Sequence, residues 1–225
     1  MNTVEELTLL QRRLIYELSE EPETAGVLFP EHPLAITLGR TGSRSQVRFG
    51  EVDLISRQLP IRYVPRGGGA MLHTAGQATC YPLFNLAELG LTPGEFVRIL
   101  RSVTARVVSD FVEAVETTGE ELAMRVKGRR IAHLGIAVRN GWSLFGVTIN
   151  VHPDLEPFPR VRVDGDDQPM TSLYRESTAR VTVDDVQKRW LEGMAEAFSC
   201  VSAEIPTGRE APLVRLFPYA RPRRN

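Results

Sequence analysis

The sequence has little cysteine and no long uninterrupted apolar run, and both absences exclude classes of protein. Its two cysteines, Cys80 and Cys200, lie far apart and match neither a disulfide framework nor a metal-binding spacing. Its four histidines also lack close ligand spacing, so we expect no metal and no cofactor. Residues 1–20 carry charges throughout, which argues against a signal peptide or membrane span there and predicts a cytoplasmic protein with no membrane partner.

The sequence also lacks an excess of either charge. Lysine and arginine number 27 against 28 aspartates and glutamates, for a net charge of -1, so nucleic acid is not an expected partner. It has no internal repeats and no low-complexity linker. A length of 225 residues with 42% hydrophobic content suffices for one core and is short for two. We therefore expect a single, monomeric domain over residues 1–218 and a basic flexible tail over residues 219–225.

The most distinctive stretch is residues 66–77, which place four glycines and a histidine between two strand-like runs. Glycine has no Cβ, so backbone N–H groups in such a loop can approach an acyl or phosphate oxygen closely. Residues 67–69 alone are also typical of a hairpin turn. The whole block, which begins at Arg66 and includes His73, favours a ligand-binding loop instead.

Apolar residues at helical spacing predict three helices. The first covers residues 7–18 and ends before Pro22. The second begins at the capping box Thr92-Pro93-Gly94-Glu95 and continues to a stop at Gly119. The third begins at the cap Thr182 and runs to about Phe198.

Shorter apolar runs bounded by turn residues predict the strands. Lys127-Gly128 and Asn140-Gly141 are typical of tight turns, so the last three strands should form an antiparallel meander. Together with the helices they predict an α+β architecture, with a mixed, largely antiparallel sheet flanked by helices. The expected strands cover residues 26–29, 34–38, 47–49, 61–64, 78–84, 122–126, 131–138 and 142–151.

Several separated motifs make the chain resemble a known family, a likeness that hydrophobic periodicity alone could not show. They are Gln11-Arg12-Arg13-Leu14, Glu31-His32-Pro33, Thr37-Leu38-Gly39-Arg40, Arg66-Gly67-Gly68 with His73, Gly76-Gln77, Gly128-Arg129-Arg130-Ile131-Ala132, Leu134-Gly135, and Asn150-Val151 with Asp154-Leu155 and Pro157-Phe158. In this order and near this spacing, as far as about Leu173, the chain resembles the octanoyltransferase family, also called lipoate-protein ligase B. A lone Arg-Gly-Gly-Gly run would be weak support, but the set is specific.

The resemblance implies a cytoplasmic acyltransferase of lipoate biosynthesis with the biotin/lipoate protein ligase catalytic-domain fold. Such an enzyme moves an octanoyl group from octanoyl-acyl carrier protein to a lysine on lipoyl domains of 2-oxoacid dehydrogenase or glycine cleavage proteins. It also implies three acyl-binding stretches. They are Arg66, Gly67, Gly68, Gly69, Ala70, Met71, Leu72 and His73; His133, Leu134 and Gly135; and Gly146, Val147 and Thr148.

Residue chemistry alone supports only the first of these stretches. His133 and Gly135 otherwise look like ordinary strand residues, and Gly146 like a strand glycine that marks a bulge or a close approach. Neither a histidine nor a glycine at such a position predicts ligand binding without the resemblance.

The chain departs from the family at the two catalytic positions. The resemblance places Asp164 where the family has its cysteine nucleophile, and Arg130 where it has the lysine that assists transfer. A carboxylate that attacks a thioester gives a high-energy mixed anhydride, and arginine cannot move a proton at physiological pH. The loop after Asp164 is also about one residue shorter than the family pattern, and more acidic.

Three hypotheses therefore compete. In the first, the protein transfers the acyl group directly, with Asp164 as general base and Arg130 polarising the carbonyl, although pairing with arginine makes a carboxylate a poor base. In the second, it is an inactive pseudoenzyme that binds acyl groups, acyl carrier protein or lipoyl domains, and Asp164 and Arg130 form a fixed ion pair. The third, an ATP-dependent ligase, is the weakest because such ligases also use a lysine at the position of Arg130. Cys80, within a strand, is expected to be buried and unreactive.

Overall fold

The computed structural model describes residues 2–117, 122–205 and 213–217. The main sheet has eight strands in the order β10-β11-β1-β5-β9-β8-β7-β6, and every neighbouring pair is antiparallel. The expected meander is present as β7, β8 and β9. The strands are β1 (Ala25–Leu28), β5 (Gln77–Leu83), β6 (Val115–Glu116), β7 (Ala123–Val126), β8 (Arg129–Arg139), β9 (Trp142–Asn150), β10 (Val201–Ile205) and β11 (Leu213–Phe217).

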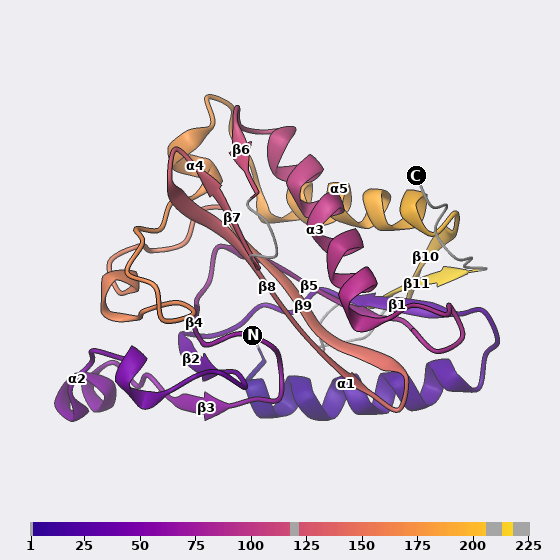
Figure 1. Ribbon diagram of the computed structural model, residues 1–225, viewed down its shortest axis with the longest axis horizontal. Helices are drawn as coiled ribbons and strands as arrows, with labels where there is room; N and C mark the ends of the chain where they lie inside the picture. Colours follow the sequence, from indigo (N-terminus) through magenta and orange to yellow (C-terminus); the bar gives the residue numbers. More distant parts are fainter. Residues whose placement is uncertain (1, 118–121, 206–212, 218–225) are drawn as a thin grey trace.

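A second, three-stranded sheet has the order β3-β2-β4 and lies at one end of the molecule (Figure 1). Its strands are β2 (Ala35–Leu38), β3 (Ile61–Tyr63) and β4 (Ala70–His73). β2 and β3 run parallel, whereas β2 and β4 run antiparallel. This arrangement confirms the α+β class and the mixed, largely antiparallel strand pairing.

Helices cover both faces of the main sheet. The long helices are α1 (Val4–Ser19), α3 (Pro93–Ser109) and α5 (Val183–Ala197), and each begins at a capping box. The α3 and α5 helices lie on one face of the sheet and α1 on the other (Figure 1). Successive strand residues point to opposite faces, so Val27 packs in the core with α3 and α5 while Leu28 packs in the core with α1.

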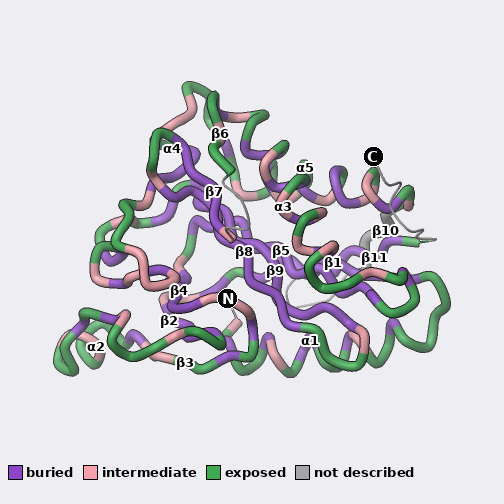
Figure 2. Tube along the Cα trace, in the orientation of Figure 1, coloured by how far each residue is buried: buried purple, intermediate pink, exposed green. Residues whose placement is uncertain are grey.

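Both faces of the main sheet are buried, which explains why its strands are continuous apolar runs in the sequence. All nine residues of β9 are buried, and buried residues follow β8 along most of its length (Figure 2). A third apolar cluster joins the small sheet to residues 158–163 through Ile36, Leu72, Phe158 and Val163. This cluster anchors the chain immediately before Asp164. No described helix is long and apolar enough to cross a membrane.

Several expected elements need correction. The second helix ends at Ser109 rather than Gly119, and Val115 belongs to β6, because the chain turns at Ala114, which has a positive φ of 56°. Residues 47–49 form no strand. Val47 makes one isolated bridge to Val161, and a short helix, α2 (Glu51–Ser56), follows.

The expected binding loop, residues 66–77, is also only partly a loop, because residues 70–73 form the buried strand β4. The sequence pattern did not show β4, β10, β11 or the short helix α4 (Leu173–Glu176). The acidic segment 154–168 contains one turn of 3-10 helix, Phe158–Arg160. Gly119 and the tail from residue 219 onward lie outside the described residues.

Candidate functional site

Two of the three stretches that the resemblance implied are neighbours in one antiparallel ladder. β8 and β9 pair so that the second stretch faces the third residue by residue. The partners are His133 with Thr148, Leu134 with Val147, and Gly135 with Gly146. A Cβ on Gly146 would lie 2.6 Å from Cδ of Pro82, so the expected close approach occurs there, between β9 and β5.

The first stretch, residues 66–73, which we call the glycine strand, crosses the same part of β8. The backbone N–H of Gly67 donates to the carbonyl oxygen of Ile136 at 2.8 Å. A Cβ on Gly135 would lie 2.9 Å from the carbonyl oxygen of Gly67, so this crossing requires glycine. The structure therefore brings all three stretches together.

Asp164 reaches this site from the loop that follows the 3-10 helix. Its backbone N–H donates to the carbonyl oxygen of Ala70 at 3.2 Å, and Val163 forms a parallel bridge with Ala70. Asp164 has a positive φ of 56°, and Gly165 follows at 80°. The tight turn that results points the Asp164 side chain back at the glycine strand.

Two hydrogen-bond donors and one histidine nitrogen surround the Asp164 carboxylate. Oδ1 accepts a hydrogen bond from the backbone N–H of Gly69 at 2.6 Å, and Oδ2 accepts one from Nη1 of Arg130 at 2.9 Å. Nδ1 of His133 lies 3.0 Å from Oδ2. The side chain of Arg130 is only 3% exposed and that of Asp164 22%. The expected ion pair between Asp164 and Arg130 is therefore present, and it is largely withdrawn from solvent.

These contacts decide the protonation state of Asp164. Burial alone would raise the pKa of this carboxyl group, but His133, the Gly69 N–H and Arg130 together lower the pKa well below its usual value. Asp164 therefore stays ionised and is a weak proton acceptor. This counts against the hypothesis in which Asp164 acts as the general base.

His133 is the main residue at this site that sequence reasoning undervalued. Both ring nitrogens are buried, and neither makes a hydrogen bond of good geometry among the described residues, although Nδ1 has the 3.0 Å contact with Asp164. Burial lowers the pKa of His133, as do the charges of Arg66 and Arg130, whereas Asp164 opposes the shift. The imidazole is therefore neutral at pH 7, and one of its nitrogens is a free proton acceptor.

A small cavity lies beside His133. It has room for about one water, with about 10 Å³ available to the centre of a water-sized sphere. The cavity is lined by Met71, Leu72, Gln77, Ile131, Ala132, His133, Thr148, Asn150, Phe158, Val163 and Met170. Residues of the glycine strand, β8 and β9 thus line one small and mostly apolar cavity.

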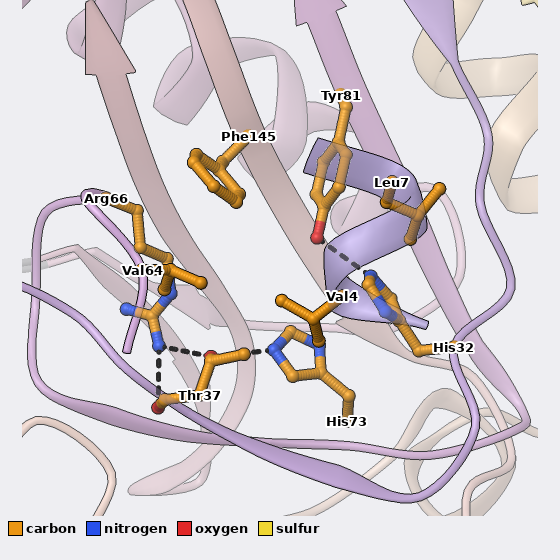
Figure 3. Close-up of a pocket in the computed structure, with 9 residues that line it drawn as sticks. All are labelled: Val4, Leu7, His32, Thr37, Val64, Arg66, His73, Tyr81 and Phe145. Atoms are coloured by element: carbon orange, nitrogen blue, oxygen red, sulfur yellow. Dashed lines mark hydrogen bonds between the residues drawn. The ribbon is translucent and has the colours of Figure 1, made fainter. Parts of the chain in front are cut away.

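A second polar cluster includes side chains of the glycine strand (Figure 3). Nη2 of Arg66 donates to Oγ1 of Thr37 at 2.8 Å, and Thr37 in turn contacts Nε2 of His73 at 2.9 Å. Nε2 of His32 lies 2.8 Å from the Tyr81 hydroxyl. His32 is buried, and burial lowers its pKa to about 4.

Gln46 is a further contact residue that the sequence did not identify. Its Oε1 accepts a hydrogen bond from the backbone N–H of Ala70 at 2.8 Å. Gln46 belongs to a 3-10 turn, Arg44–Gln46, and forms a capping box with Ser43, a local pattern that marks the turn but not its contact with the glycine strand. Only the fold brings it to the glycine strand.

Two other expectations concern alternative chemistry. Cys80 is fully buried, and burial raises the pKa of its thiol well above the usual value, so the structure supports the expectation that it is inert. No group of three or more histidine, cysteine, aspartate or glutamate side chains that could hold a metal ion occurs within the described part of the chain.

Comparison with known proteins gives a consistent family. Residues 5–195 match the lipoyl protein ligase A/B catalytic domain. An octanoyltransferase from Syntrophobacter fumaroxidans is 37% identical over 155 residues, covering 68% of this chain and 67% of the relative. One from Desulfotalea psychrophila is 32% identical over 174 residues, covering 76% and 78%.

Solved structures agree at the level of the fold. A bipartite lipoate protein ligase, studied with its E2 lipoyl domain from Thermoplasma acidophilum, aligns with a TM-score of 0.63 and 14% identity, covering 83% of this chain and 78% of that chain. A lipoate-protein ligase A bound with ATP aligns with a TM-score of 0.56 and 16% identity, covering 76% and 71%. The catalytic-domain match and the curated relatives together show that this chain belongs to the octanoyltransferase family.

Proposed function

We propose that this protein transfers an octanoyl group from acyl carrier protein to a lysine of lipoyl domains in one step, without an acyl-enzyme intermediate. The observation that carries the proposal is the set of contacts around the Asp164 carboxylate, the residue that the resemblance assigns to the position of the family nucleophile. Gly69, Arg130 and His133 lie within 3.0 Å of it, so it is neither free nor basic. The three stretches that we propose to bind the acyl group nevertheless lie next to it.

A covalent step has no suitable nucleophile here. Attack by Asp164 on a thioester would give a mixed anhydride and would cost the ion pair with Arg130. The thiol of Cys80 is buried and protonated. The remaining route is direct attack of the acceptor amine on the thioester carbonyl, which needs only positioning and a proton acceptor.

The substrates follow from the family. The curated relatives are named octanoyltransferases, and one structural neighbour was studied with its E2 lipoyl domain. An octanoyl donor and a lipoyl-domain acceptor are therefore the substrates that we propose for this chain. The ATP-dependent alternative loses support, because Arg130 is committed to Asp164 and also lies 3.4 Å from Asp166.

A second candidate function is binding without transfer. It is favoured by the cavity beside His133, which holds about one water and must open before it can accept an acyl chain. Methionine side chains such as Met71 and Met170 line this cavity and are flexible enough to move aside. Opening is therefore compatible with either function.

The test is to incubate the purified chain with octanoyl-acyl carrier protein and an apo lipoyl domain, and to follow the mass of the acceptor. Octanoylation that depends on this chain supports transfer. A stable complex with the donor or the acceptor, and an unchanged acceptor mass, supports binding alone and rejects the transfer proposal. An acceptor whose target lysine has been replaced controls for non-enzymatic acylation at other sites.

A further inference from the structure

The buried ring of His133 meets a different environment on each of its edges. Nδ1 faces the Asp164 carboxylate at 3.0 Å. The Cε1 edge faces the glycine strand, 3.5 Å from where a Cβ on Gly68 would lie. Both ring nitrogens lack a hydrogen bond of good geometry among the described residues, and only Nδ1 has an ion-pair contact, the one with Asp164. Buried polar atoms are nearly always paired, so an unpaired one beside a candidate site calls for an explanation.

The 3.0 Å contact with Asp164 favours one tautomer of the ring. An ionised carboxylate only accepts hydrogen bonds, so the stable neutral form of His133 carries its proton on Nδ1. The lone pair then lies on Nε2. The same tautomer logic operates in catalytic triads, where a buried aspartate orients a histidine and leaves its other nitrogen free to take a proton.

The charges around His133 keep the ring neutral. Arg130 lies three residues before it on β8, and Arg66 and His73 approach from the glycine strand. Asp164 lies on the loop and is the anion in contact with the ring, while Asp166 contacts Arg130 at 3.4 Å. Burial and the two guanidinium groups together outweigh Asp164 and lower the pKa of His133. The imidazole is therefore ready to accept a proton near pH 7.

The site thus pairs a free, neutral imidazole nitrogen with a cavity shared by all three acyl-binding stretches. We propose that His133 is the general base of the direct transfer, and that Asp164 and Arg130 are positioning residues that orient it. This inference rests on the proposed function. It changes the role of Asp164 from a chemical participant to the partner that fixes the tautomer of His133.

The step balances without any further reactant. The neutral Nζ of the acceptor lysine attacks the thioester carbonyl carbon, and the new C–N bond forms as an Nζ proton passes to Nε2 of His133. The C–S bond then breaks, and the leaving thiolate takes the proton back from the imidazolium. The products are an amide and a free thiol, and His133 returns to its neutral form.

Two variants test the role of His133. His133→Gln should lower kcat by roughly 10²–10⁴-fold, the usual contribution of a general base, with KM for the carrier protein changed far less. His133→Ala should lose as much, and added imidazole should restore part of the rate. The parent rate should also fall on acidification through the pKa of His133, below the usual histidine value, and this acid limb should be absent from the variants. His152→Gln, an exposed histidine outside the site, is the matched control.

The pairing of His133 with Asp164 can also be tested by a measurement that needs no turnover. In the parent protein, ¹⁵N NMR of labelled histidine should show His133 neutral with its proton on Nδ1 at pH 7, and Asp164→Asn should change this signature.

Full activity in a folded His133→Gln variant would overturn the role of His133 while one-step transfer stands. If the parent shows the expected NMR signature but transfers nothing, one-step transfer and the role of His133 as its base would both be overturned. The contact between His133 and Asp164 would still stand, so the error would lie in the proposed function. An Nε2–H tautomer or a protonated ring at pH 7 would overturn the base assignment directly.

Discussion

At the scale of single residues, Asp164 places a negative charge against Arg130 and the Gly69 N–H. Arg130 is almost fully buried, and its remaining charged contact within the described residues is Asp166. Two charges withdrawn from water stabilise the fold only while both are present. Asp164 therefore contributes to stability as well as to the orientation of His133.

Replacing Asp164 with asparagine should destabilise the protein by about 3 kcal/mol, because Arg130 and His133 would lose their anionic partner. Asp167→Asn in the same loop is the matched control. Asp167 pairs with Arg48 and Arg162 but is 54% exposed, so its loss should cost less than about 1 kcal/mol. Urea unfolding of both variants measures the difference. Equal losses would show that the Asp164 contacts carry no special stability.

Acid should destabilise the protein through its buried histidines. Burial lowers the pKa of His32 to about 4, whereas the unfolded chain titrates near 6.5. Between these values the unfolded state binds the proton and the folded state does not, so stability falls as the pH drops. His32 alone should account for about 3 kcal/mol of this loss between pH 7 and pH 4.

The check is the unfolding free energy of the parent and of His32→Gln across this pH range. The variant lacks the titrating group, so its stability should fall by less than that of the parent, whatever its stability at pH 7. His73, whose pKa burial also lowers, should leave a residual slope. Parallel curves for the two proteins would contradict this assignment.

The residues of the site differ in how far the sequence could reveal them. The glycine strand was visible from composition, because glycines flanked by arginine and histidine are unusual in a plain turn. Asp164 and Arg130 were found only through the family resemblance, since neither has a local pattern. The contacts of His133 and Gln46 depend on the loop at Asp164 and the turn at residues 44–46 folding back, and no spacing rule encodes those distances.

At the scale of elements, the site depends on how closely β8 approaches the glycine strand and β9 approaches β5. Gly146 on β9 faces Gly135 on β8, and both positions lack room for a side chain. Phe145, immediately before Gly146, has a positive φ of 59°, and its backbone N–H donates to Oε1 of Gln11 on α1 at 2.8 Å. Helix α1 therefore contacts the strand that carries one of the three stretches proposed to bind the acyl group.

Gly146→Ala should destabilise the protein by about 3 kcal/mol, because its Cβ would collide with the β5 backbone at Cys80 and with Pro82. Gly94→Ala offers a matched control in helix α3, where a Cβ would meet nothing within 4 Å. That change should stabilise the protein by about 0.4–1 kcal/mol, since alanine restricts the unfolded chain. Thermal unfolding of the pair distinguishes them. A neutral Gly146→Ala would show that β5 and β9 can separate freely.

Capped helices and the turn-linked meander were predictable because their signals are local. The capping boxes at Thr92 and Thr182 mark helix starts that the structure confirms, and the tight turns at residues 127–128 and 140–141 join β7, β8 and β9 as expected. β4 was hidden because all four of its residues are buried, which removes the alternation of a half-exposed strand. β11 pairs with distant β1, which no local pattern records, and β10 pairs in turn with β11.

At the scale of the whole molecule, the site lies where the small sheet, β8 and the Asp164 loop meet. The core under α3 and α5 and the core under α1 support the main sheet from opposite faces. The third cluster ties the small sheet to residues 158–163 and so positions Asp164. All three clusters thus support the candidate site.

The central claim is that octanoyl transfer proceeds without an acyl-enzyme. The direct measurement is a quenched single-turnover reaction with octanoyl-acyl carrier protein and apo lipoyl domain, with intact-mass detection of every protein. The double variant Asp164→Cys, Arg130→Lys restores the family pair and shows that an adduct would be detected. The account predicts that the acceptor gains the octanoyl group while the parent chain never carries it. An octanoyl adduct on the parent chain that decays as the acceptor is modified would contradict it.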